Sequence, residues 1–521
     1  MYSRLPLFLL FLSFTACTDL ELEPPDRLNP ATVFSQEENY EALVARLYAG
    51  LAVTGQAGPT GASDIASLDE GFSNYIRVLY KLQELPTEEA VIAWGDVGLP
   101  ELIFQSWTSD NQFVRAMYYR IFFQVSLANE FLRETTSERL DSRGIREGFR
   151  PTVNRQRAEA RFLRALSYWH GIDMFGDIIF FTEADEIGGT PPGVRSRAEV
   201  FQFLVEELAA IEADLPEAGT AEYGRADRGA LYMLQAKLFQ NAEVYTGTAR
   251  HTEATTALES LFDSEAYALA ENYRDLFGAD NDQFDELIFT VNFDGDRTQS
   301  FGGLTFLTHA PVGGAMDPAD YGINGGWFGL RTSPEFVALF PDVTGDADER
   351  AIFFTEGQSL EVNNISEFTQ GYAVPKFTNI TSSGVAGSDP GFADTDFPLF
   401  RLADAYLMYA ESVLRGGGGS RERALELVNE LRQRAYNGTG GNITEEELTL
   451  DFILDERARE LYWECHRRTD RIRFGAFSTE GTWAWKGGVQ EGRTTSAIYN
   501  LFPIPSSELL SNPNLTQNEG Y

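Results

Sequence analysis

The sequence predicts a mostly α-helical fold, a tetratricopeptide-like scaffold of helix pairs that carries a loop-rich region with short strands. The first observation is helical periodicity. Apolar residues recur three and four positions apart through most of the first half of the chain and again after residue 398. The second observation is a change of texture between these parts, where residues 286–397 form short β-prone pieces broken by Gly, Pro, Asn and Asp. We therefore expect helices to build the frame and loops to cover one part of it.

Six amphipathic stretches predict helices in the first half of the chain. The first runs from about Ser35 to Leu51, where Ser35 and Glu38 have the spacing of a capping box. The other five predicted helices are residues 111–135, 155–175, 198–215, 226–245 and 252–262. The helix at 198–215 follows a second capping box, formed by Ser196 and Glu199. Helix pairs of about 35 to 45 residues with runs of Ala and Tyr or Phe are typical of helical-repeat scaffolds.

Helical periodicity returns near the end of the chain, at residues 399–414, 421–434 and 445–468, before an irregular tail. The last of these stretches holds a row of three glutamates at four-residue spacing beside three arginines: Glu456, Glu460, Glu464, Arg457, Arg459 and Arg467. The alternative is the acid and base of a glycosidase, but such carboxylates flank a bond from different elements, about 5 to 10 Å apart. We interpret the row as a structural ion network that holds helices together.

Composition excludes several classes of function. The 521 residues include 79 acidic and 41 basic ones, a net charge of -38, and such a surface repels nucleic-acid phosphates. Only two cysteines and four scattered histidines are present, which disfavours metal and redox chemistry. Lysine is rare among the basic residues. A high-salt habitat and a genome that favours arginine codons are both consistent with this bias.

The first 16 residues have the order of a bacterial export signal. Arg4 precedes the apolar run Leu5 to Phe14, and Thr15-Ala16 lead into Cys17. Small residues before a cysteine resemble a lipobox, so we predict that residues 1–16 are removed and that Cys17 is lipidated. An ordinary secretory peptide with a chance cysteine is the alternative. The acidic residues after Cys17 resemble the surface-export signal of Bacteroidetes lipoproteins.

Catalytic and cofactor motifs are missing from the sequence. It contains no nucleophile elbow, P-loop, dinucleotide fingerprint or metalloprotease helix motif. The acidic segment Asp342 to Glu349 suggests calcium, but its glycine and ligand positions do not follow the twelve-residue loop pattern. We therefore expect no catalytic residues, no cofactor and no metal, with calcium at this segment as the alternative.

A series of motifs is spread over nearly the whole mature chain: Cys17-Thr-Asp-Leu-Glu-Leu-Glu-Pro-Pro25, Ala158-Glu-Ala-Arg-Phe-Leu-Arg-Ala165 continuing to Phe175-Gly-Asp177, Pro398 to Glu411, Val428 to Ala435, Asp455 to Leu461, Asp470 to Gly475, Pro503-Ile-Pro505, and Gln517-Asn518 with Gly520-Tyr521. In order and spacing they resemble the SusD/RagB family of outer-membrane nutrient-capture lipoproteins. The chain departs from the family at Cys465, Thr469, Arg471 and Glu519.

The resemblance implies the organisation of the mature chain. It gives an N-terminal helical scaffold at residues 17–285 and a C-terminal region at 286–521, which is loop-rich at 286–397, helical at 398–475 and irregular at 476–521. It also implies a lipid-anchored outer-membrane protein, facing the cell exterior, that forms a lid on a SusC-like TonB-dependent transporter. Family members bind oligosaccharides, or less often peptides, and are not enzymes.

Aromatic residues in loops are the informative candidates for a sugar site, because the apolar face of a pyranose stacks on an aromatic ring. Trp107, Trp169 and Trp463 lie in helical patterns that predict core packing, whereas Trp94 and Trp327 lie in glycine-punctuated loops. The predicted ligand-binding set is Trp94, Trp327, Tyr321, Phe328, Tyr75, Asp69 and Arg77. For both loop tryptophans, partial burial in an irregular core is the competing interpretation.

The leading functional hypothesis is therefore capture of a glycan and its delivery to the transporter. Peptide capture is the alternative within the binding class, and a membrane-anchored glycoside hydrolase is the alternative from another class. The sequence does not name the sugar, because linkage specificity depends on loop geometry.

Overall fold

The computed structural model describes residues 30–59, 61–186 and 188–521. The helices before residue 286 are α1 (Pro30–Val33), α2 (Tyr40–Ala52), α3 (Tyr75–Gln83), α4 (Leu99–Phe104), α5 (Gln112–Glu134), α6 (Ser137–Ser142), α7 (Arg150–Phe175), α8 (Arg197–Ile211), α9 (Arg228–Gln240), α10 (Ala242–Thr246) and α11 (His251–Asp263). Those after it are α12 (Gly303–His309), α13 (Pro334–Val337), α14 (Leu402–Leu414), α15 (Arg421–Ala435), α16 (Leu450–Leu461), α17 (Arg467–Arg473) and α18 (Ser506–Ser511). The strands are β1 (Val91–Ile92), β2 (Ile178–Ile179), β3 (Val194–Arg195), β4 (Leu287–Val291), β5 (Leu330–Arg331) and β6 (Phe397–Arg401).

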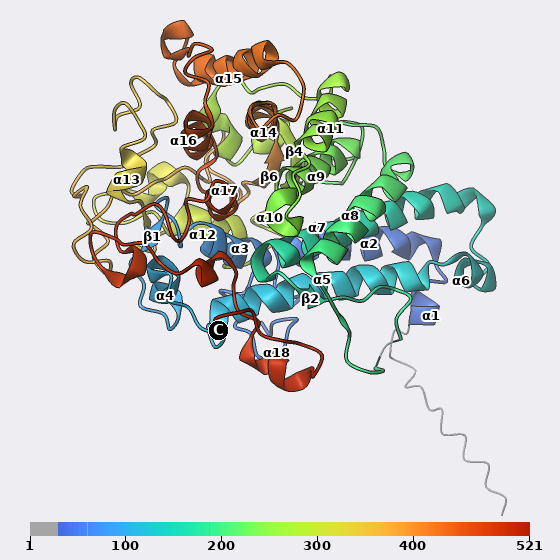
Figure 1. Cartoon of the computed structure of the whole chain (residues 1–521). Coiled ribbons are helices and arrows are strands. Elements are labelled where there is room, and N and C mark those ends of the chain that lie inside the picture. The colour runs from blue at the N-terminus through green and yellow to red at the C-terminus, as the bar shows by residue number, and fades with distance from the viewer. Residues whose placement is uncertain (1–29, 60, 187) are drawn as a thin grey trace, which may run out of the picture.

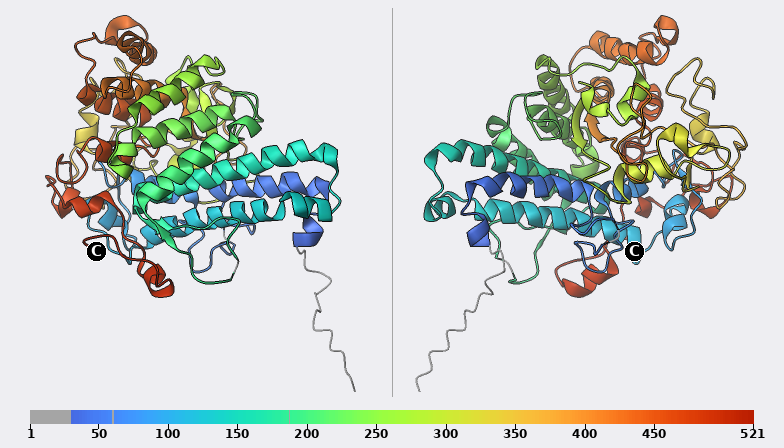
Figure 2. Two further views of the ribbon diagram at one scale, coloured as in Figure 1. Left: turned by 45° about the vertical axis from the view of Figure 1, so that its right-hand side comes forward. Right: turned by 180° about the vertical axis from the view of Figure 1, so that it is seen from behind.

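The helices stack as predicted. α5 and α7, of 23 and 26 residues, pack along each other, and α2 packs against both of them in an arm that projects from the body (Figures 1 and 2). The stacking continues from α7 to α8 and α9, then from α11 to α14 and α15. The prediction of a mostly α-helical, tetratricopeptide-like scaffold is confirmed.

Two predicted helix starts have different outcomes. The capping box at Ser196 is formed, because its side chain accepts from the backbone N–H of Glu199 while Glu199 accepts from the Ser196 N–H. The box at Ser35 is not formed. Its hydroxyl donates to the Thr32 carbonyl at 2.7 Å, and α2 begins only at Tyr40, after a short 3₁₀ turn.

Other predicted helices are interrupted. The stretch 226–245 breaks at Asn241 between α9 and α10. The stretch 445–468 breaks between α16 and α17, where Trp463 and Cys465 have φ angles of 64° and 67°. These left-handed conformations cannot continue an α-helix, so Glu464 lies outside the helix expected to carry it. The start of the stretch 399–414 is strand β6 rather than helix.

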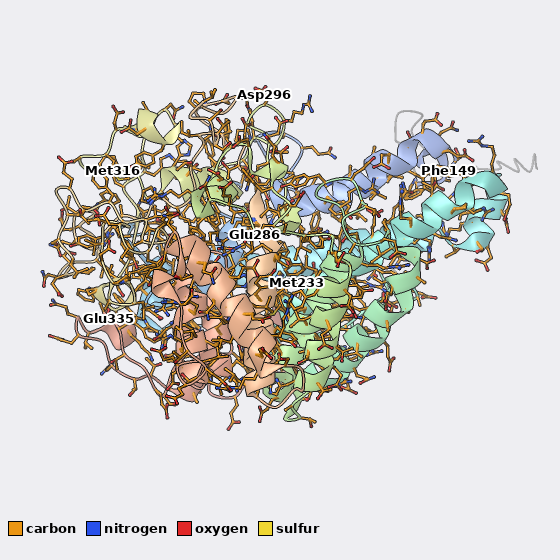
Figure 3. All side chains as sticks on the ribbon, turned by 90° about the horizontal axis from the view of Figure 1, so that it is seen from above. Phe149, Met233, Glu286, Asp296, Met316 and Glu335 are labelled. Carbon is orange, nitrogen blue, oxygen red and sulfur yellow. The ribbon has the colours of Figure 1, made fainter. Side chains whose placement is uncertain are left out.

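The loop-rich region shares its core with the scaffold. One hydrophobic cluster includes residues from Phe34 to Leu515, so the predicted boundary at residue 286 separates two textures within a common core. In Figure 3, Phe149 marks the tip of the helical arm, Met316 and Glu335 lie at the loop-rich end, and Glu286 lies between them. The three described sheets are two-stranded and antiparallel, pairing β1 with β5, β2 with β3 and β4 with β6.

The glutamate row of α16 is a buried ion network, as the sequence predicts. Glu460 accepts from Arg401 at 2.7 Å and from Arg350 at 3.1 Å, and it also pairs with Arg434. Glu456 accepts from Arg350 at 2.9 Å, and both glutamates have exposed fractions of 0%.

The arginine partners differ in part from those expected. Arg459 pairs with Glu456, but Arg457 pairs with Asp404 and Asp470, and Arg467 pairs with Glu88. Glu464 lies beyond the end of α16, and its partners are Arg401 and Lys376. The network therefore joins α16 to the loop-rich region, to β6 and to the segment before β1.

The expected membrane features lie mostly outside the described residues. The predicted export signal at residues 1–16 and the lipidation site Cys17 are not among them. Within the described ranges, no helix combines the length and apolar character that crossing a membrane requires.

We expect Glu456→Gln to lower the free energy of unfolding at neutral pH by about 3 to 5 kcal/mol, because it leaves buried guanidinium groups without their counter-charge. Urea unfolding followed by circular dichroism measures the effect. Glu445→Gln is the matched control, because the Glu445 side chain is 69% exposed in its pair with Arg421. The control should change stability by about 0.5 kcal/mol or less. Equal stability of the two variants would contradict the ion network's structural role.

The same pair of proteins tests the sign of the pH dependence. Burial alone would raise the pKa of Glu456, but the charges of Arg350, Arg459 and Arg432 outweigh it and lower the pKa from 4.5 to about 2. Glu456 therefore stabilises the fold fully above its unfolded pKa, and the contribution is lost as the pH falls toward 2. The deficit of Glu456→Gln should shrink over this acidic range, and a deficit that grows on acidification would contradict the assignment.

Candidate functional site

A short sheet brings the two predicted tryptophans together. Val91 pairs with Arg331 and Ile92 with Leu330, and the Ala93 N–H donates to the Gly329 carbonyl at 2.9 Å. Trp94 follows β1 and Trp327 precedes β5, so antiparallel pairing places both side chains at the same end of the sheet.

The two tryptophans then contact each other directly. The Trp94 Nε1–H donates to the Trp327 carbonyl at 2.9 Å across a sequence separation of 233 residues. Their ring centroids are 6.3 Å apart, with an interplanar angle of 44°. Both residues are partly buried and pack against the main hydrophobic core. We call Trp94 and Trp327 the tryptophan pair.

Other rings support the tryptophan pair from below. Phe306 packs against Trp94 at 5.9 Å between centroids, and His309 packs against Trp327 at 4.9 Å. Phe301 approaches Trp327 edge-on at 6.4 Å. Burial lowers the pKa of His309, so this ring is neutral at neutral pH. The pair therefore rests on an aromatic floor formed by Phe306, His309 and Phe301.

Arg77 completes the floor. Its guanidinium carbon lies 5.7 Å from the Trp94 ring centroid and 5.9 Å from that of Trp327. The Nη1 group donates to the carbonyls of Gly71 at 2.5 Å and Phe301 at 2.6 Å. Burial lowers the pKa of Arg77 to about 10, so it stays cationic at neutral pH. Arg77 thus positions the pair through cation–π contacts and backbone hydrogen bonds.

Acidic side chains lie around this cation. Asp69 is exposed in the loop before α3, where its Oδ1 accepts from the Phe72 N–H at 3.2 Å, and Asp96 is exposed just after Trp94. The charges of Asp96 and Asp69 both act to raise the pKa of Arg77, against the larger effect of burial. Both carboxylates therefore belong to the electrostatic surroundings of Arg77.

Three other predicted residues lie apart from the tryptophan pair. Tyr75 is 1% exposed, and its hydroxyl contacts His170 Nδ1 at 2.8 Å, so its inclusion as a ligand contact is wrong. Tyr321 is half-buried against a second small apolar cluster that contains Phe368. Phe328 is 52% exposed, and its ring packs on Phe368 at 5.6 Å. Tyr321 and Phe328 thus flank the pair from a separate cluster.

The tryptophans predicted to be core residues are buried. Trp107, Trp169 and Trp463 are 1%, 7% and 0% exposed. Trp94 and Trp327 are partly buried and pack against the main hydrophobic core, so the competing interpretation, partial burial in an irregular core, stays open for both.

The glycines at positions 326 and 329, on either side of Trp327, leave no room for a side chain. A Cβ added to Gly329 would lie 2.7 Å from the Cε2 and Cζ2 atoms of Trp94, closer than real Cβ contacts allow. At Gly326 it would lie 2.2 Å from the Val312 carbonyl oxygen. The glycines that marked this loop in the sequence therefore allow a close approach of backbone and ring.

Sequence reasoning missed the residues that form the floor. Phe306 and His309 lie on α12, within the stretch 286–397 that was expected to be loop-rich. This short helix begins at Gly303 after Gly302, and glycines are typical of loops. The available signal was their three-residue spacing, which places both rings on one face of a helix. Phe301 precedes the helix and carries no such signal.

The acidic segment suspected of binding calcium satisfies its own carboxylate. Asp342 Oδ1 accepts from the N–H groups of Thr344 at 2.9 Å and Gly345 at 2.8 Å, and Oδ2 accepts from Ala347 at 3.0 Å. Across the part of the chain that the structure describes, no group of three or more His, Cys, Asp or Glu residues is arranged to hold a metal ion.

Comparison with known proteins identifies the family. The starch-binding protein SusD of Bacteroides thetaiotaomicron is 34% identical over 560 aligned positions, which cover 97% of this chain and 96% of that protein. This chain belongs to the SusD family. The sequence model described as the SusD family matches residues 343–521. SusD-like protein P2 of Formosa agariphila is 24% identical and covers 99% of both chains.

Solved structures of SusD-superfamily proteins share the fold of this family member. One from Bacteroides thetaiotaomicron superimposes with a TM-score of 0.71 at 18% identity, covering 93% of this chain and 99% of the other. Surface glycan-binding protein A from the same species, solved in complex with laminarihexaose, gives a TM-score of 0.68 at 18% identity, covering 92% and 99%.

The tight approach at Gly329 leads to a prediction. Gly329→Ala should displace the Trp94 ring and weaken its coupling to Trp327, because the new Cβ occupies the position of that ring. Near-ultraviolet circular dichroism, which reports coupled aromatic rings, should lose intensity. Gly325→Ala is the control, because a Cβ there meets nothing within 4 Å. Identical spectra for the two variants would contradict the described contact.

Proposed function

We propose that this protein is a surface-exposed outer-membrane lipoprotein that binds a glycan on the tryptophan pair and delivers it to a SusC-like TonB-dependent transporter. The observation that carries the proposal is the direct contact of two partly buried loop tryptophans that are 233 positions apart in the sequence. A pyranose ring presents an apolar C–H face that stacks on such rings, while its hydroxyls need nearby polar partners. The proposal assigns this role to Asp69 and Asp96, whose charges act on Arg77.

The names of relatives support this ligand class. One is a starch-binding protein, and a structural neighbour is a glycan-binding protein seen with laminarihexaose. The aromatic floor adds a physical argument, because rings that are already held in place lose little conformational freedom when a ligand binds. Peptide capture remains the alternative, and no described contact favours it at the tryptophan pair.

We propose binding without catalysis. A glycosidase needs two accessible carboxylates with separated pKa values on either side of the bond that breaks. The richest carboxylate row, Glu456 and Glu460 on α16, is fully buried and occupied by arginines.

Removing either ring should weaken glycan binding about 5-fold to 30-fold, since a ring–sugar contact is worth roughly 1 to 2 kcal/mol. Trp94→Ala and Trp327→Ala are compared with wild type by calorimetry on an array-selected oligosaccharide. Trp485→Ala is the matched control, because Trp485 is also half-buried but packs on Phe104 instead. Unchanged affinity in both test variants would eliminate the tryptophan pair as the site.

Release of reducing sugar from the same oligosaccharide separates the alternatives. Binding without release of reducing sugar supports the proposal. Steady release of reducing sugar would instead favour the alternative function, a membrane-anchored glycoside hydrolase.

Anchoring and partnership are tested on cells. We expect palmitate to label wild type but not Cys17→Ala, and a mild-detergent pull-down of wild type to recover an outer-membrane barrel protein. Equal labelling of both proteins would refute the lipid anchor. Recovery of the protein alone at native salt would argue against the transporter complex.

A further inference from the structure

A cavity lies in the helical arm, on the α7–α8 side of the scaffold. It has a volume of about 410 Å³ and is lined by α7, by α8 and by the segment after β2. α7 and α8 lie side by side in Figures 1 and 2. The volume is within the range of about 300 to 1,000 Å³ that small-molecule sites occupy. Three arginines of α7 line it: Arg157, Arg161 and Arg164.

Two of these arginines are neutralised by glutamates. Arg161 donates through Nε and Nη2 to Glu207, at 2.9 and 2.6 Å. Arg164 donates to Glu207 and to Glu183, each at 2.5 Å. Two cations and two anions therefore cancel on this wall of the cavity. The other charged groups of the lining are Arg157 on α7 and the exposed carboxylate of Asp214 after α8.

Arg157 makes no salt bridge to any described residue. Its Nη1 group donates to the Leu132 carbonyl and to Thr135 Oγ1, both at 2.7 Å, at the carboxyl end of α5. These two bonds use two of the five N–H donors of a guanidinium. The donors on Nε and Nη2 form no hydrogen bond within the described part of the chain, and this edge is the one that grips a carboxylate with two parallel bonds.

We propose that this cavity binds the carboxylate of a small ligand through the free edge of Arg157. The fixed guanidinium supplies both the charge and the planar geometry, because its Nη1 group is already held by α5. The ring of Phe203 lines the same cavity and offers an apolar face to the body of the ligand. This site is separate from the tryptophan pair, which no cavity-lining residue contacts among the described interactions.

Two sources share this ligand chemistry, a uronic acid of a glycan and the C-terminus of a short peptide. Calorimetry on the full-length protein in a carboxylate-free buffer uses D-glucuronate and alanyl-alanine as probes. D-glucose and alanyl-alaninamide are their neutral counterparts. We expect one of the two carboxylates to bind and its neutral counterpart not to bind, and the probe that binds identifies the source.

Arg157→Gln should raise the dissociation constant at least about tenfold, the loss expected for a charge-assisted hydrogen bond. Arg157→Lys keeps the charge without the planar edge and should bind more weakly than wild type. Arg155→Gln is the matched control on the same helix, because the Arg155 side chain is 45% exposed and only approaches Glu159 at 3.7 Å. Glycan binding at Trp94 and Trp327 should be unchanged in all three variants.

A measurement on wild type covers the case in which the variants do not fold. Phenylglyoxal modifies accessible arginines, and peptide mapping by mass spectrometry should show Arg157 modified and then protected by the probe that binds. Absence of binding by both carboxylates, equal binding by Arg157→Gln and wild type, or failure of the probe that binds to protect Arg157 would overturn the proposal.

Discussion

The buried ion pair between Glu88 and the arginines of α17 is the contact on which the candidate site depends. Arg467 donates to Glu88 at 2.7 Å, and Arg471 approaches both carboxylate oxygens at 3.1 Å. Burial alone would raise the pKa of Glu88, but these two charges outweigh it and lower the pKa to about 2. Because an unpaired buried charge costs about 3 to 5 kcal/mol, Glu88 has one stable position. It lies three residues before β1, so α17 fixes the strand from which Trp94 emerges. The pairing of β1 with β5 then carries that position to Trp327.

The same principle organises the rest of the molecule. The described loop-rich region, residues 286–397, has no long helix or large sheet to hold its segments in place, so contacts with the helical scaffold must position them. Arg350 and Arg401, both buried, supply it by reaching from this region and β6 to the glutamates of α16. A guanidinium suits this role because it binds two carboxylates at once in a fixed plane. The four lysines, at positions 81, 237, 376 and 486, are all buried as well, so the described surface carries arginine but no lysine. Buried ion pairs thus hold the loop-rich region in position against the helices.

Much of the scaffold is predictable from sequence because its helices bury one face and expose the other. The pattern locates α5 to within one residue at each end, since its polar positions recur regularly. Helix α3 was not predicted, because eight of its nine residues are buried and it has no polar face to give an amphipathic pattern. This burial also explains why Tyr75, expected in a loop, is a core residue. Glycine punctuation separated Trp94 and Trp327 from the three core tryptophans, and both are partly buried where those three are buried. Their contact has no local signal, because a two-residue ladder between segments so far apart depends on the complete fold.

The central claim is that the tryptophan pair is assembled before the ligand arrives and is the surface on which the glycan binds. A crystal structure of the protein with its best-bound oligosaccharide tests this most directly. The account predicts a pyranose ring stacked on Trp94 or Trp327, the Trp94 Nε1–H still bonded to the Trp327 carbonyl, and Arg77 unmoved beneath them. An oligosaccharide bound elsewhere, or a tryptophan pair that has separated to admit it, would contradict the account.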